Sequence, residues 1–163
     1  MNRKIFNAGE VDLRKLSALL LVPSILVIAD VAADRTALKF LLLPPLGALT
    51  YLVFVNPAHI EMNVRRVVIC PTATAVLAWS LASTVGYNAL SVFLVTAGTM
   101  AIMWGLDAFS IVPPLALALL TILLHDQVRG HLDYLLSVFV FTVALYGLYL
   151  LWLRIPFERK PKG

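Results

Sequence analysis

Residues 42–50 read LLPPLGALT and residues 111–119 read IVPPLALAL, so one short pattern occurs twice in the chain. In each copy a pair of prolines, Pro44-Pro45 or Pro113-Pro114, stands near the start of an apolar run. Proline-interrupted apolar segments at corresponding positions in the two halves of a chain are typical of membrane transporters, where they point to the substrate site. The pattern therefore predicts a small membrane transporter or channel.

The composition favours lipid as the solvent of this chain. Hydrophobic residues make up 61% of it, charged residues make up 13%, and the mean hydropathy is +0.91. Soluble domains contain about 45–50% apolar and about 25% charged residues. A chain of 163 residues cannot bury this excess in one globular core. We therefore expect an all-α membrane helix bundle that forms a single transmembrane domain over residues 1–163.

Continuous apolar runs divide the chain into segments of about the length that a membrane-spanning helix needs. Six such segments are predicted: Leu16–Ala33, Ala37–Val55, Val67–Val85, Ala89–Leu106, Ile111–Leu124 and Tyr134–Leu153. Three segments in each half would place the second half upside down relative to the first. The doubled proline pair therefore predicts two inverted three-segment repeats.

The distribution of positive charge orients the six segments. Arg35, Lys39 and Arg129 fall on one side of the membrane, and every other Lys and Arg falls on the side that holds both termini. The positive-inside rule then predicts cytoplasmic termini, in a cell inner membrane. A five-segment alternative separates the two basic ends of the chain. A cleaved signal peptide ending near Ala33 is another alternative.

Each proline pair is predicted to begin a short helix. Proline lacks a backbone N–H and clashes with the preceding turn, so a helix can start at such a pair but cannot run smoothly through it. Pro44–Val55 and Pro113–His125 would reach only about 18–20 Å, against a hydrocarbon core of about 30 Å. Two half-helix starts facing a common centre would favour an anion there through their N–H groups. The alternative is a pair of kinked spanning helices without a cavity.

Three stretches resemble the HPP family of integral membrane proteins, which is named for a His-Pro-Pro motif. The matching residues are Val112–Leu117 for that motif, Pro45–Ala48 for a Pro-Phe-Gly-Ala stretch and Val64–Val67 for a Pro-Arg-Asn-Val stretch. Val112 stands where the motif has histidine, and Arg66 stands where the family has asparagine. The resemblance covers about residues 37–153. It implies transport, since plant and cyanobacterial members are associated with nitrite.

The charged residues at the ends of the apolar runs can each be interpreted in two ways. Arg65 and Arg66 would attract an oxyanion, because a guanidinium pairs well with one, or they would serve only as topology determinants. Asp30 and Asp107 would either lie in a transport path or sit at the interface, where a carboxylate costs little.

Other polar residues give weaker signals. His59 with Glu61, and His125 with His131, have no further ligands beside them, so we expect no metal and no cofactor. Thr72, Thr74 and Thr99 would line a polar path or serve as packing residues between helices. No two catalytic-type residues have a convincing spacing, so an enzyme is not expected.

The sequence thus predicts a small-anion transporter or channel in the lipid bilayer. We expect a homo-oligomer or an assembly with membrane-complex partners, and no nucleic acid as a partner. Its expected substrate-binding residues are Pro44, Pro45, Gly47, Arg65, Val112, Pro113, Pro114 and Ala116. The alternative is a non-catalytic structural subunit of a larger membrane complex, a role that suits a chain with short loops.

Overall fold

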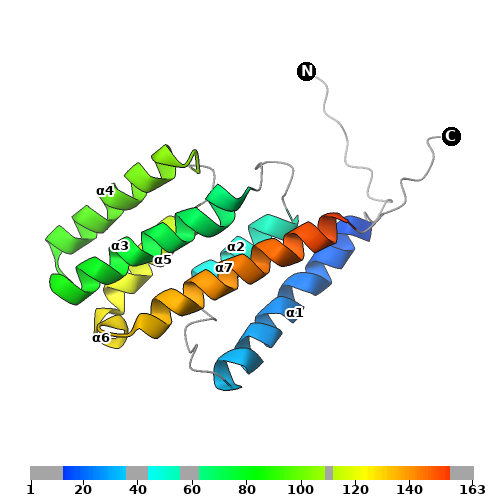
Figure 1. Ribbon diagram of the computed structural model, residues 1–163, viewed down its shortest axis with the longest axis horizontal. Coiled ribbons are helices and arrows are strands. Elements are labelled where there is room, and N and C mark those ends of the chain that lie inside the picture. Colours follow the sequence, from blue (N-terminus) through cyan, green and yellow to red (C-terminus); the bar gives the residue numbers. More distant parts are fainter. Residues whose placement is uncertain (1–12, 36–43, 56–62, 109–111, 155–163) are drawn as a thin grey trace.

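The computed structural model describes residues 13–35, 44–55, 63–108 and 112–154, and the regular elements among them are all helices (Figure 1). In chain order these are α1 (Leu13–Arg35), α2 (Pro44–Val55), η2 (Arg65–Ile69), α3 (Cys70–Thr84), α4 (Ala89–Gly105), α5 (Pro113–Leu123), α6 (His125–Val128) and α7 (Leu132–Leu153). The all-helical prediction is confirmed, and each expected apolar segment contains a helix. The short α6 was not expected.

Both proline pairs begin helices, as the sequence predicts. The helix α2 starts at Pro44 and has 12 residues, and α5 starts at Pro113 and has 11. Proline suits the first turn of a helix, because its fixed φ angle is helical and its missing N–H would have no partner there. The segment after Pro113 ends at Leu123, a little earlier than predicted. The stretches 36–43 and 109–111, which precede the two proline pairs, lie outside the described residues.

A π-helical turn, η2, leads into α3. In this turn the Cys70 N–H donates to the carbonyl of Arg65, five residues earlier. Pro71 follows directly and cannot donate a hydrogen bond to the turn before it. A wider turn moves the preceding carbonyls away from the proline ring, so the chain continues as one helical rod from Arg65 to Thr84.

The helix α3 is at the centre of the packing. It packs against α4, α5, α6 and α7, whereas α1 packs mainly on α2, and α2 packs in turn on α5 and α7. In Figure 1, α4 and α1 accordingly lie at opposite edges of the molecule. The largest buried cluster brings together Leu49 and Phe54 of α2 with Val138 and Trp152 of α7.

The contact between α3 and α4 is built from small residues. Each helix carries a stripe of buried residues at every fourth position: Cys70, Thr74, Ala78 and Ala82 on α3, and Ser91, Val95, Thr99 and Met103 on α4. Ala78 shares a buried cluster with Val95. Cys70 shares another with Met103, so the stripes run antiparallel. Small side chains let the two helix backbones approach closely, which is how helices associate in lipid.

The outer faces of the helices are strongly apolar. Exposed side chains include Leu20, Ile28, Phe93, Trp104, Leu136 and Leu151, while the buried side chains include the hydroxyl residues Thr50, Thr74, Ser91, Thr99, Thr121, Ser137 and Thr142. A soluble monomer rarely exposes so much contiguous apolar surface. The helix faces thus have the polarity that a lipid environment requires.

Two stretches among the described residues, Arg65–Thr84 and Leu132–Leu153, are long and apolar enough to cross a membrane. The other apolar helices are shorter: Leu20–Ala29, Pro44–Phe54, Ala89–Gly105 and Pro113–Leu123. The prediction of six crossing segments is therefore supported by length for two of them. The inverted repeat stays a prediction.

Gly98 of α4 tests the closeness of the α3–α4 contact. A Cβ atom at this position would lie 2.6 Å from Leu77 Cδ2, whereas a Cβ atom at Gly105 of the same helix meets nothing within 4 Å. Replacing Gly98 with leucine should destabilise the protein by about 1–3 kcal/mol, the usual cost of overpacking. Gly105→Leu is the matched control and should not lower the thermal unfolding midpoint in detergent. Equal midpoints for the two variants would contradict the packing.

Candidate functional site

The two proline-pair helices lie together and form a hollow of about 490 Å³ that is open at the surface, since most of its lining residues are exposed. Its lining residues come from the first turn of α5 and from the middle and end of α2: Val112, Pro113, Ala116, Ala48, Tyr51 and Leu52. Segments that are distant in the sequence are thereby brought into contact, as the doubled pattern suggests. The lining is apolar except for the hydroxyl group of Tyr51.

The other expected site residues lie elsewhere. Pro45 and Pro114 are buried within the packing of their helices, and Pro44 is exposed. Gly47 faces α1, since a Cβ atom there would lie 3.6 Å from Leu26 Cδ2. The hollow therefore contains the start of α5 but not the start of α2.

The start of α5 offers few N–H groups to an anion. Pro113 and Pro114 have none, and the N–H groups of Leu115 and Ala116 both donate to the carbonyl of Val112, at 3.0 and 3.4 Å. A helix N-terminus binds anions through N–H groups that have no partner within the helix. The expectation that N–H groups freed at this half-helix start hold an anion is therefore wrong for α5, because the prolines that start the helix also remove its donors.

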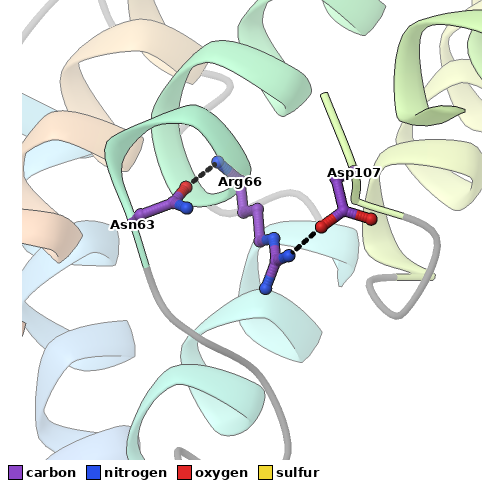
Figure 2. A network of polar contacts seen from close by, with 3 residues as sticks. All are labelled: Asn63, Arg66 and Asp107. Carbon is purple, nitrogen blue, oxygen red and sulfur yellow. Dashed lines mark hydrogen bonds and ion pairs between the residues drawn. The ribbon is translucent and has the colours of Figure 1, made fainter. Parts of the chain in front are cut away.

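A polar network lies where η2 meets the end of α4 (Figure 2). The Arg66 guanidinium is 2.5 Å from a carboxylate oxygen of Asp107, and the Arg66 backbone N–H donates to Asn63 Oδ1 at 3.0 Å. The Arg66 side chain is only 12% exposed, whereas that of Asp107 is 91% exposed. The neighbouring Arg65 is exposed. Arg66 is thus neutralised by Asp107, and Arg65 is the arginine of this pair that faces outward.

The remaining polar candidates are only partly described. His59 and Glu61 lie outside the described residues, as does the side chain of Asp30. Among the described residues no group of three or more His, Cys, Asp or Glu side chains is placed to hold a metal ion. His125 pairs instead with Asp126, with Nε2 to Oδ1 at 3.1 Å, and its ring stacks on Tyr87.

Several buried polar atoms have no hydrogen-bond partner among the described residues. They include the hydroxyl groups of Thr72 and Ser83, the indole nitrogen of Trp79 and Nδ1 of His125. Sequence reasoning considered Thr72 as a lining residue but missed Trp79 and Ser83. The spacing of residues 72, 79 and 83 could have identified Trp79 and Ser83 from the sequence, because it places all three residues on one face of a helix.

Comparison of the chain with protein-family models, curated proteins and solved structures found no match in any of the three. The resemblance to the HPP family therefore stays a prediction.

The backbone of Asp107 has a positive φ angle of 52°, a conformation in which asparagine and aspartate are tolerated but β-branched residues are disfavoured. Asp107→Val should lower the unfolding midpoint more than Asp107→Asn, with a backbone cost of about 1–2 kcal/mol. A midpoint for Asp107→Val equal to that of Asp107→Asn would contradict the left-handed conformation.

A double-mutant cycle that combines Asp107→Asn with Arg66→Gln isolates the ion pair. The coupling free energy between the two side chains should be below about 1 kcal/mol, since water screens the exposed carboxylate.

Proposed function

We propose that this chain is a small integral membrane protein that transports a small anion, with nitrite as the substrate that the HPP resemblance suggests. The single observation that carries the proposal is the packing of α2 against α5, two short helices that start at proline pairs and border an open hollow of about 490 Å³. Helices of 12 and 11 residues reach only about 18 Å, so neither crosses a hydrocarbon core of about 30 Å by itself.

The polarity of the helix surfaces supports placement in a membrane. Bulky apolar side chains face outward, and Trp104 of α4 is 77% exposed. Seven serine and threonine side chains among the described residues are buried inside the bundle. Lipid favours this arrangement because it solvates apolar surface and offers no partner to polar groups.

The hollow is the proposed wide part of the transport path, and Arg65 is the proposed anion-attracting residue at its cytoplasmic approach. Arg65 is exposed, and its neighbour Arg66 is already paired with Asp107. An exposed guanidinium raises the local concentration of anions without holding them tightly, because water screens the charge. The path is proposed to operate in a homo-oligomer without a cofactor and without a catalytic step.

Filling the hollow should block transport. Ala116→Phe places a ring in the hollow beside Pro113, so the uptake of nitrite into proteoliposomes should fall several-fold relative to the unmodified protein. Ala101→Phe, at an exposed position on α4, is the matched control and should leave uptake unchanged. Nitrate, formate and chloride, with empty vesicles as the blank, define selectivity. Full uptake by a correctly inserted Ala116→Phe variant would exclude the hollow as the path.

Both termini are proposed to be cytoplasmic in a cell inner membrane. Cys70 is the chain's only cysteine and is fully buried, so Cys70→Ala provides a background for single reporter cysteines. A cysteine in place of Arg154 should be protected from an impermeant maleimide in spheroplasts and reactive in inverted vesicles. A cysteine in place of Arg129 should behave in the opposite way. Matching reactivity of the two positions would rule out this topology.

The second candidate is a structural subunit of a larger membrane complex. The observation that favours it is the exposed apolar face of α4, which carries Phe93, Met100 and Trp104 at helical spacing. Such a face suits a neighbouring helix as well as lipid. Purification with fixed partner proteins and no anion flux would favour this role over transport.

A further inference from the structure

The helix α3 carries three polar side chains on one face, and none of them lines the hollow. Thr72, Trp79 and Ser83 are separated by seven and then four residues, so their directions around the helix axis agree within about 40°. The row that they form, called the α3 row below, extends roughly 16 Å along the helix. Trp79 packs against the large buried cluster that includes residues of α7. The α3 row therefore faces the interior of the bundle.

The polar atoms of the α3 row are buried, and none has a hydrogen-bond partner among the described residues. Most other hydroxyl groups in these helices bond to the carbonyl four residues earlier in their own helix: Ser24, Thr50, Ser80, Thr84, Thr96, Thr121, Ser137 and Thr142. The indole N–H of Trp79 cannot do so, because a rigid ring holds it away from its own backbone. The buried hydroxyl groups of Thr74 and Thr99, in the α3–α4 contact, also have no hydrogen-bond partner among the described residues. A buried polar group without a partner is energetically unfavourable, so a bound ligand that forms hydrogen bonds with the α3 row would stabilise it.

One end of the α3 row leads toward His125. Gly86 lies three residues beyond Ser83, and a Cβ atom at Gly86 would be 3.8 Å from His125 Cδ2. The His125 side chain is 26% exposed, and the ring of Tyr87 stacks on it with centroids 6.3 Å apart. The Ser83 end of the α3 row therefore lies near a partly exposed ring.

The ring nitrogens of His125 have different surroundings. Nε2 lies 3.1 Å from Asp126 Oδ1, so Nε2 carries the proton that this carboxylate accepts. Nδ1 is buried and has no partner among the described residues. The neutral ring therefore offers an acceptor at Nδ1, and a protonated ring offers a donor. Neither α3 nor α5, which pack against α6, carries a charged residue.

We propose that a small anion binds inside the bundle at the Trp79–Ser83 end of the α3 row, and that the Tyr87–His125 stack covers its entrance. The indole N–H of Trp79 is only a donor, and the hydroxyl groups of Thr72 and Ser83 can donate as well, so all three suit a guest that accepts hydrogen bonds. The choice of an anion rests on the proposed transport function. The α3 row supplies the donors that the proline-started helix α5 lacks.

The fluorescence of Trp79 tests this site directly. The chain has three tryptophans, so Trp104→Phe combined with Trp152→Phe leaves Trp79 as the only one. Potassium iodide is the probe, because iodide is a small anion that quenches indole emission on contact, and potassium gluconate keeps the ionic strength constant. Acrylamide, a neutral quencher, reports on access without anion binding. Iodide should remove most of the Trp79 emission along a saturating curve, with acrylamide much less effective.

Ser83→Ala and Ser80→Ala form a matched pair on α3. Ser83 belongs to the α3 row, whereas Ser80 is exposed and donates to the carbonyl of Val76 at 2.8 Å. Ser83→Ala should raise the iodide concentration for half-quenching several-fold, and Ser80→Ala should leave it unchanged. If the single-tryptophan protein does not fold, Trp79→Phe in the natural chain replaces it. The iodide-sensitive part of the emission should then disappear.

Two results would overturn the proposal. Trp79 emission that does not respond to iodide would show a site closed to anions, and quenching that rises linearly and equally with iodide and acrylamide would show open access without binding. Saturable quenching in a protein that transports none of the tested anions would keep the anion site and reject transport. Flux with iodide-insensitive Trp79 emission would keep transport and reject the α3 row.

Discussion

The close approach of α4 and α5 to the central helix α3 is the constraint on which the rest of the structure depends. Alanine, threonine, serine and cysteine make up most of the α3–α4 contact, together with Val95 and Met103, and Ala118 of α5 joins the same cluster as Ala78. A bulky residue at these positions would separate the helix backbones. The bundle can therefore keep its large side chains for its outer faces and for the cluster between α2 and α7.

The proline pairs have two physical effects that act in opposite directions. They fix where α2 and α5 begin, which makes both helices short, and the two helices border an open hollow. They also remove the N–H groups that would make a helix start attractive to an anion. The hollow is accordingly lined mainly by apolar residues. The unpartnered hydrogen-bond donors lie instead on α3.

Polar groups in this bundle are satisfied locally wherever the chain allows it. Most hydroxyl groups bond to their own helix, Arg66 pairs with Asp107, and Tyr134 of α7 shares a hydrogen bond with Thr121 of α5. Such local pairing removes most of the cost of polar groups in an apolar surrounding. The α3 row differs in that it places an indole N–H and two hydroxyl groups without a partner among the described residues on one face of one helix.

The sequence by itself determined the helical class, the approximate extent of the apolar segments and the starts of α2 and α5. Each of these depends on local properties: apolar runs, and prolines that cannot continue a helix. Only the tertiary structure decided that Gly47 faces α1, that Arg66 rather than Arg65 pairs with Asp107, and that Thr72, Trp79 and Ser83 face the interior. Those outcomes depend on which helix faces pack together. The sequence is apolar on nearly every face of each helix, so its periodicity does not show which face is buried.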